Sequence, residues 1–155
     1  MCFICERIRM IQEGTNPYFV KKLETGYVVI GDHQHFRGYT LFLYQEHVAE
    51  LFDVQQEIRA KHLEEMTLVA KAVSRAFGAE KMNYECLGNG DAHLHWHLFP
   101  RITGDLENHG NRGKDPVWWY PMEKMYDRTN RPNPEELKTL KQQLLFELDR
   151  LLENE

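Results

Sequence analysis

The sequence predicts an α+β fold in which helices pack on an antiparallel β-sheet. Three observations lead to this prediction. Short runs of β-branched and aromatic residues bounded by glycine are typical of strands, and they occur on both sides of one long segment. In that segment apolar residues recur at intervals of three and four, the period of a helix with one buried face. A Gly-Asn-Gly turn signal then joins two strands as a hairpin, which makes them antiparallel.

The elements follow in order along the chain. Strands are predicted at 27–31 and 38–44, joined by a polar link that is long enough for a hairpin connection. Strands at 82–87 and 93–100 are joined by the turn 88–91. Between the two pairs of strands lies the helix, which ends at Gly78. Its apolar stripe consists of Ile58, His62, Met66, Val69, Val73 and Phe77.

The last part of the chain contains a long loop and a second helix. The loop is rich in glycine and proline but also holds clustered aromatic residues, which argue against plain disorder. Asn133 is a good N-cap and Pro134 suits the first helical position. The buried face of this helix is marked by Leu137, Leu140, Leu144, Leu148 and Leu151. We expect one domain over 1–155, divided into a core, an aromatic loop and a C-terminal helix at 1–103, 104–132 and 133–155.

Bulk properties exclude several classes of partner. The net charge of −5 argues against a general nucleic-acid-binding surface, which needs a broad basic face. No apolar run approaches the length of a membrane span. The first residues lack a basic leader followed by an apolar core, and three cysteines without such a leader indicate a reducing compartment. We therefore expect a cytoplasmic protein that binds neither nucleic acid nor a membrane.

The most informative segment is His93–Pro100, where three histidines alternate with large apolar residues. In a strand the three imidazoles would share one face and the apolar side chains the other. Histidine is the side chain whose ordinary pKa lies near physiological pH, so it can act as a base, a nucleophile or a ligand. This alternation is hard to explain by packing alone.

Three explanations of the histidines are open. They could be incidental residues of a surface strand. They could form a three-histidine metal site, but same-face neighbours lie about 6.5–7 Å apart, so the outer pair is too far apart for one metal ion. One histidine could instead be a nucleophile, while the others place phosphate oxygens and protons.

The segment His93–Arg101 resembles the signature of the histidine triad (HIT) nucleotide hydrolases and transferases, in which His-x-His-x-His precedes two apolar positions. Three further segments are similar to parts of that family: Cys2–Cys5 to its opening, 38–48 to its Gly-His-x-Leu-Val-x-Pro-Lys-x-His-Val strand and turn, and Asn83–Glu85 to the strand before the triad. The resemblance covers residues 1–101. It implies a HIT-like fold with an antiparallel sheet of about five strands, a long central helix and a C-terminal helix. It also implies a homodimer formed through a sheet edge and the long helix.

The resemblance assigns roles to two histidines of the triad. His95 would attack the α-phosphorus of a nucleotide and form a nucleotidyl-histidine intermediate, which water then hydrolyses. His97 would serve the leaving group as a general acid or hydrogen-bond donor. The implied substrate is therefore a nucleotide.

The resemblance also implies groups that bind the phosphates. Asn89 and the backbone amides of Gly90 and Asp91 are expected to hold non-bridging oxygens. Asn83 and Asn89 are both candidates for the polar residue that relatives place near the bridging oxygen. Arg101 would either meet a distal phosphate, which suits its guanidinium group, or form a surface ion pair.

The expected nucleoside site departs from the family pattern. Asp32 is the nearest counterpart of the aspartate that binds ribose in relatives, slightly shifted along the chain. An apolar base pocket is expected from Phe3, Ile4 and Ile30, although each is equally well explained as core. Tyr39 stands where relatives have a histidine after the hairpin glycine. The loop aromatics could cover the nucleotide, stack a second base, pack at a dimer contact or form a satellite core: Trp118, Trp119 and Tyr120.

Cys2 and Cys5 form a CxxC pair, which by itself fits a redox dithiol, half of a zinc site or two small buried residues. One branch of the superfamily binds structural zinc through such a pair together with two histidines. The residues at the corresponding positions here are Cys2, Cys5, His47 and His93. The resemblance therefore implies a closed structural Zn²⁺ site that pins the N-terminus and the triad strand without activating water.

The predicted function is hydrolysis of a nucleotide at its α-phosphate, with dinucleoside polyphosphates such as diadenosine tetraphosphate as the first choice of substrate. Nucleoside phosphoramidates are the alternative substrates. Two other classes stay open: a nucleotide-binding HIT protein with little turnover, and a hydrolase that uses zinc at the triad itself. A chelator would directly abolish the activity of a hydrolase with zinc at the triad, whereas a protein with a structural zinc site would first lose stability.

Overall fold

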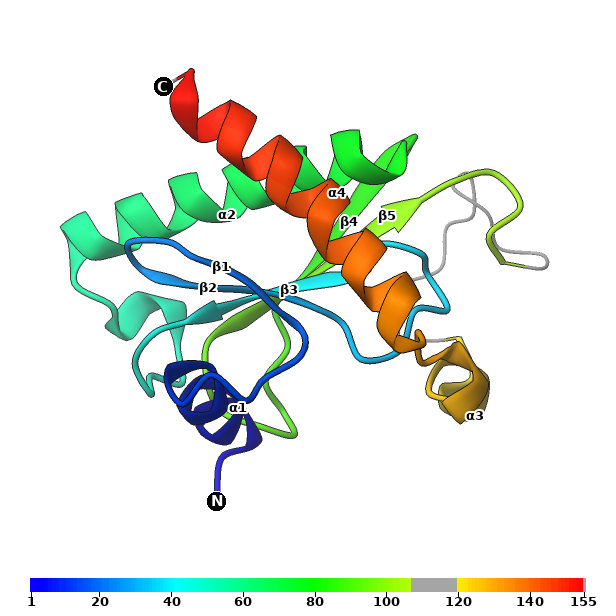
Figure 1. Cartoon of the computed structure of the whole chain (residues 1–155). Helices are drawn as coiled ribbons and strands as arrows, with labels where there is room; N and C mark the ends of the chain where they lie inside the picture. Colours follow the sequence, from blue (N-terminus) through cyan, green and yellow to red (C-terminus); the bar gives the residue numbers. More distant parts are fainter. Residues whose placement is uncertain (107–119, 155) are drawn as a thin grey trace.

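The computed structural model describes residues 1–106 and 120–154 (Figure 1). It is an α+β fold with a five-stranded antiparallel sheet in the order β1-β2-β3-β5-β4, which confirms the predicted fold class. The strands are β1 (Phe19–Lys22), β2 (Gly26–Ile30), β3 (Thr40–Tyr44), β4 (Lys81–Glu85) and β5 (His95–Arg101). The helices are α1 (Phe3–Gln12), α2 (Gln56–Phe77), α3 (Met122–Met125) and α4 (Pro134–Glu153).

Helices α2 and α4 cover one face of the sheet and form the main core with it (Figure 1). The helix α2 ends at Gly78, which has the left-handed φ of 65° that closes a helix. At the start of α4, Asn133 and Glu136 form a capping box and Pro134 follows the cap, as the sequence predicted for this end. In the described ranges, we find no helix long and apolar enough to cross a membrane.

The opposite face of the sheet carries two smaller apolar clusters. In one, Ile4 and Ile8 of α1 pack on residues of β2 and β3. In the other, Phe99 of β5 packs with Phe36 and Met125. The side chains of His95 and His97 lie on this same face, because β5 alternates between the two faces and its Trp96 and Leu98 pack into the main core.

The connection between β4 and β5 differs from the predicted hairpin turn. The two strands are antiparallel as expected, but residues 86–94 lie between them instead of a tight turn, and His93 precedes β5. The reason is that Leu94 pairs with another segment: its N–H donates to the carbonyl of Val48, and its carbonyl accepts from Tyr44. Only His95 and His97 therefore share a strand face, which corrects the expectation of three histidines in one row.

Two α-helices and one strand of the described residues were not predicted. Helix α1 and strand β1 flank the N-terminal turn, and α3 lies inside the expected loop. Tyr120 packs against the cluster of Phe36 and Phe99, as the satellite-core explanation expected. Trp118 and Trp119 lie outside the described residues, so the predictions for them stay predictions.

The helix face of the sheet contains a buried chain of hydrogen bonds behind the triad strand. The indole N–H of Trp96 donates to His62 Nε2 over 3.1 Å. Nδ1 of this neutral imidazole therefore carries the proton and donates to Thr25 Oγ1 over 2.8 Å. Thr25 in turn donates to the carboxylate of Glu65 over 2.5 Å. His62 was expected in an apolar stripe of the helix, whereas its imidazole joins α2 to the strand of the triad.

The position of His62 makes the stability of the protein depend on pH. Burial lowers the pKa of His62 to about 4 from an ordinary value of 6.5. As the pH falls below 6.5, the unfolded chain binds a proton that the folded protein binds only near pH 4. Stability is therefore lost as the pH falls through this window. Between pH 7 and pH 5 the contribution of His62 to the free energy of unfolding falls by about 2 kcal/mol.

The change His62→Gln removes this titration. Urea unfolding at pH 7 and pH 5 is expected to show a loss of stability that is about 2 kcal/mol smaller in the variant than in the wild type. Only the change with pH is compared, so the cost of the substitution itself cancels. Equal losses in the two proteins would show that His62 is not held neutral in the folded state.

Candidate active site and metal centre

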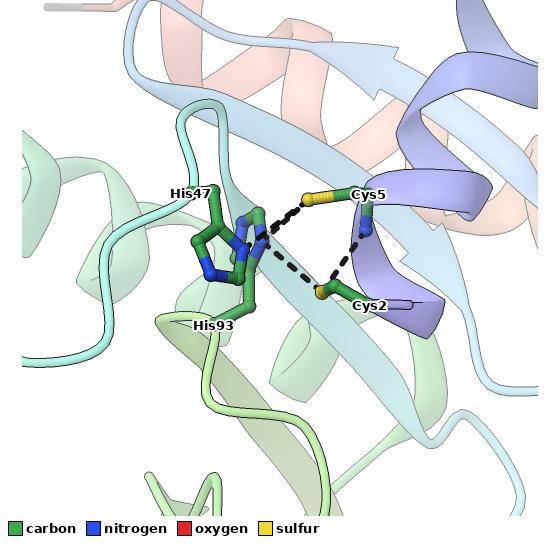
Figure 2. Close-up of side chains that lie close together, drawn as sticks. All are labelled: Cys2, Cys5, His47 and His93. Carbon is green, nitrogen blue, oxygen red and sulfur yellow. Dashed lines mark hydrogen bonds between the residues drawn. The ribbon is translucent and has the colours of Figure 1, made fainter.

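Four side chains from three separate segments meet beside the first turn of α1. Figure 2 shows Cys2 and Cys5 pointing toward His47, from the turn after β3, and toward His93, from the loop before β5. Cys5 Sγ lies 3.3 Å from His47 Nδ1 and 3.4 Å from His93 Nδ1. The four possible ligand atoms all lie within 4.8 Å of one another. These residues could hold a metal ion.

The surroundings of His93 orient it for this role. Its imidazole is buried, and its Nε2–H donates to the carbonyl of Tyr44 over 2.8 Å. This bond leaves the lone pair of Nδ1 directed at the two cysteines. Burial lowers the pKa of His93, which favours the neutral form that binds metals.

The N-terminus of α1 is fixed by local bonds as well. The Cys2 sulfur accepts a hydrogen bond from the backbone N–H of Cys5, as an N-cap side chain does. Asp91 accepts a hydrogen bond from the backbone N–H of Phe3 over 2.9 Å and places a negative charge at the positive end of the helix. The loop before β5 therefore contacts α1 at two places, through Asp91 and through His93.

His95 is buried at the start of β5, and its tautomer is fixed by the backbone. Its Nδ1 lies 2.5 Å from the carbonyl oxygen of His93. Because a carbonyl only accepts, Nδ1 carries a proton, so in the neutral imidazole the lone pair is on Nε2. No described residue bonds to this Nε2. The side chain therefore presents a free nucleophilic nitrogen.

His97 lies next to His95 on the same face, with ring centroids 4.7 Å apart. Its Nδ1 lies 2.5 Å from the hydroxyl of Tyr39. Burial and then the neighbouring His95 lower the pKa of His97 to about 4, so its imidazole is neutral at physiological pH. The neutral imidazole of His97 therefore stands beside that of His95 on β5.

A small cavity of about 50 Å³ lies beside α1, lined in part by Phe3, Ile4 and Asp32. This volume has room for a few water molecules. The sequence had grouped Phe3 and Ile4 with Ile30, but Ile30 is fully buried in the main core on the other face of the sheet. Asp32 forms an ion pair with Arg7, whose guanidinium lies 4.6 Å from the centroid of the Phe3 ring. Arg7 therefore binds the carboxylate that was expected to bind ribose.

Arg101 does not occupy the place that was expected for it. Its side chain is only 4% exposed, and it binds Asp105 through two nitrogens at 2.6 and 3.1 Å. It also donates to Asn83 Oδ1 over 2.9 Å and lies over the ring of Phe36. Arg101 therefore forms an ion pair, as one of the two expectations had it, but a buried one instead of one at the surface, and its contact with a distal phosphate stays a prediction.

The remaining phosphate candidates lie in two different environments. Asn83 lies in β4 opposite Phe99 and accepts the hydrogen bond from Arg101, so one of its polar atoms is already engaged. Asn89 and Gly90 are exposed in the loop between β4 and β5. Their contact with a phosphate stays a prediction.

Sequence reasoning missed two residues of the site. Arg7 and Tyr39 stand beside expected site residues but come from distant segments, α1 and the link before β3. Tyr39 departs from the family's histidine at this position, but its contact with His97 did not follow from that difference. We found no comparable signal for Arg7.

Comparison with known proteins agrees with this architecture. A histidine triad protein from Sinorhizobium meliloti is 22% identical, with a TM-score of 0.70 over 90% of this chain and 93% of that chain. A hypothetical histidine triad nucleotide-binding protein from Sulfolobus tokodaii is 17% identical, with a TM-score of 0.68 over 95% and 93% of the two chains. A Zn-bound histidine triad family protein from Mycobacterium smegmatis is 20% identical, with a TM-score of 0.66 over 99% and 97%.

These likenesses establish the fold. A search of curated proteins finds no significant match. The HIT domain family matches residues 19–104, which is more than half of the chain and includes the triad. With the triad strand, its adjacent histidines and the matching fold in place, the chain belongs to the HIT family.

Proposed function

We propose that this protein is a nucleotide hydrolase that cleaves dinucleoside polyphosphates at an α-phosphate through a nucleotidyl intermediate on His95. One observation carries the proposal. His95 donates its Nδ1 proton to the carbonyl of His93 and keeps the lone pair of Nε2 free of any described partner. This is the state that a nucleophilic imidazole needs.

The reaction has two displacements at phosphorus. First, the lone pair of His95 Nε2 forms a bond to the α-phosphorus, and the bond from phosphorus to the bridging oxygen breaks with its electrons on the departing phosphate. His95 then carries a positive charge, which the carbonyl of His93 stabilises through Nδ1–H. Second, a water oxygen attacks the same phosphorus, the P–N electron pair returns to Nε2, and one water proton passes to solvent. The nucleoside monophosphate leaves and His95 is restored.

The cavity lined by Phe3 and Ile4 is the proposed place of the nucleobase. Because it has room for only a few waters, the base enters only if the side chain of Arg7 moves away from Asp32. The same movement would release the Asp32 carboxylate for the ribose hydroxyls. The Arg7–Asp32 ion pair would thus be exchanged for a pair of hydrogen bonds to the substrate.

We propose that the cysteine and histidine cluster binds Zn²⁺. In a tetrahedral site with bonds of about 2.0 Å to nitrogen and 2.3 Å to sulfur, neighbouring ligand atoms lie about 3.3–3.8 Å apart. Three of the four S···N distances within the cluster, 3.3, 3.4 and 3.7 Å, match that spacing. Four protein ligands leave no open position, so the ion would supply structural cross-linking and no Lewis-acid chemistry. His93 would then fix both the cluster and the carbonyl that orients His95.

We also propose a homodimer formed through the edge strand β4. Strand β4 is at one end of the sheet, and Tyr84 on it is 47% exposed. An open edge with an exposed aromatic residue is suited to pairing with a second copy. Light scattering on the purified protein measures the mass directly, and a monomer would contradict this assembly.

The proposed reaction is tested by hydrolysis of diadenosine tetraphosphate in ¹⁸O-labelled water. The expected products are AMP and ATP, with the label in AMP because water attacks the α-phosphorus held by His95. Rapid quenching followed by mass spectrometry is expected to find an adenylyl group on His95. Hydrolysis of adenosine phosphoramidate alone would contradict the substrate class, and release of no AMP from either compound would contradict hydrolysis itself.

A further inference from the structure

Tyr39 is held rigidly against the catalytic face of the sheet. Its side chain is 4% exposed and stacks on Phe99, with ring centroids 4.4 Å apart and planes within 3°. On Gly31 an added Cβ would lie 2.2 Å from the Tyr39 ring, so the absence of a side chain there makes room for the phenol. The hydroxyl of Tyr39 is thereby fixed 2.5 Å from Nδ1 of His97.

The direction of this hydrogen bond follows from the partners available. Burial raises the pKa of Tyr39 well above 10, so the phenol keeps its proton and needs an acceptor. In the described part of the chain, the acceptor within reach of this hydroxyl is His97 Nδ1. If Nδ1 carried a proton, the buried phenolic O–H would have no acceptor, which costs about 1–3 kcal/mol. Tyr39 therefore donates, Nδ1 accepts, and the proton of the neutral His97 is on Nε2.

Neighbouring backbone and side-chain groups thus give the Nε2 atoms of the two histidines different protonation states. His95 has a lone pair at Nε2, because its proton is held at Nδ1 by the carbonyl of His93. His97 has an N–H at Nε2, because Nδ1 is occupied by Tyr39. One nitrogen can attack phosphorus while the other donates to an oxygen of the same phosphate or of the leaving group.

We propose that Tyr39 is a positioning residue that locks His97 as a hydrogen-bond donor, and that this restricts efficient cleavage to leaving groups able to depart as anions. The proposal rests on the proposed function of His95. When the bond from His95 Nε2 to phosphorus forms, His95 becomes positively charged and opposes protonation of the adjacent His97. His97 then has no proton to give without becoming an anion itself, so it stabilises charge without transferring a proton.

The leaving group must therefore be able to depart without receiving a proton from His97. The electrons of the broken P–O bond go to the departing phosphate oxygen, which is stable as an anion and needs only the hydrogen bond from His97 Nε2. An amine leaving group is different, because the nitrogen of a broken P–N bond needs a proton that a neutral His97 does not supply. Tyr39 therefore favours phosphoric anhydrides over phosphoramidates at this site.

The tautomer is tested without any substrate by ¹⁵N NMR of histidine-labelled protein. The chain has eight histidines, and the signals lost in His97→Asn identify His97. The wild type is expected to show His97 with a protonated Nε2 and an unprotonated Nδ1, and Tyr39→Phe is expected to shift the proton partly or wholly to Nδ1. A protonated Nδ1 in the wild type, or an unchanged spectrum in Tyr39→Phe, would overturn the proposal.

The selectivity is tested with diadenosine tetraphosphate and adenosine phosphoramidate. In Tyr39→Phe, kcat for the tetraphosphate is expected to fall roughly tenfold or more with little change in KM, since loss of tautomer control acts on the chemical step. The kcat for the phosphoramidate is expected to fall less, so the ratio of kcat for the tetraphosphate to kcat for the phosphoramidate falls. Tyr27→Phe removes the hydroxyl of another buried tyrosine on this face and is the matched control, with both rates unchanged.

The outcomes separate this proposal from the function on which it rests. Equal losses on both substrates in Tyr39→Phe, or no loss on either, would overturn the role of Tyr39. Absence of turnover by the wild type would overturn the proposed function alone, because the NMR spectra decide the tautomer separately.

Discussion

Replacement of His95 by alanine is expected to lower hydrolysis of diadenosine tetraphosphate by at least about 10⁴-fold, because the variant cannot form the covalent intermediate. The loss should be in kcat, with binding of AMP largely retained, since the proposed base cavity involves Phe3 and Ile4 rather than His95. Steady-state release of AMP and titration calorimetry measure the two quantities. The adenylyl adduct found in the wild type should be absent from the variant.

A histidine outside the triad provides the control. His33 contacts Arg131 and Tyr126, and His33→Ala is expected to keep wild-type turnover. Circular dichroism of both variants checks that the fold is retained. If His95→Ala and the wild type released AMP at the same rate, the nucleophile would lie elsewhere and the proposed mechanism would be wrong.

Removal of one cysteine from the cluster is expected to have the largest effect on stability. Cys5 lies closest to both histidine ligand atoms, so Cys5→Ala should reduce bound zinc from about one ion per chain to a small fraction. The melting temperature should fall by roughly 10 °C or more, because several kcal/mol of metal binding are lost in a chain of this size. Metal analysis and thermal unfolding measure both effects.

The third cysteine is a matched control for this change. Cys86 is exposed and lies outside the cluster, so Cys86→Ala should keep the bound metal and the melting temperature. Treatment of the wild type with a chelator should lower the melting temperature while turnover persists at temperatures where the protein is still folded. Immediate loss of turnover in folded, chelated protein would instead indicate a metal ion in the chemistry itself.

Local chemistry made the regular elements predictable. Helix α2 ends where Gly78 allows a left-handed residue, and α4 begins where Asn133 and Pro134 favour a helix start. Helix α1 was not predicted, because Ile4 and Ile8 mark its buried face in a segment of only ten residues. Strand β1 is only four residues long, too short for a clear hydrophobic pattern, and it is held in the sheet by pairing with β2.

The site was less predictable, because several of its contacts join residues that are distant in sequence. The cluster of cysteines and histidines followed from a family pattern, and the structure brings those four residues together. The contact of Tyr39 with His97 and the ion pair of Arg7 with Asp32 depend on how three segments pack, which no spacing in the sequence reveals. Arg101 was misjudged because its partner Asp105 lies just beyond the strand, where the sequence suggested an open loop.

The order of the strands has a consequence for biosynthesis. Strand β5 leaves the ribosome after β1 to β4, yet it lies between β3 and β4 in the sheet. His93, which completes the cluster with Cys2, follows that cysteine by 91 residues and lies two positions before the same strand. The nascent chain therefore keeps an open gap at the centre of its sheet until residues 93–101 emerge. Arrival of this one segment closes the sheet, completes the cluster and delivers both histidines together, and helix α4 then follows to cover the finished sheet.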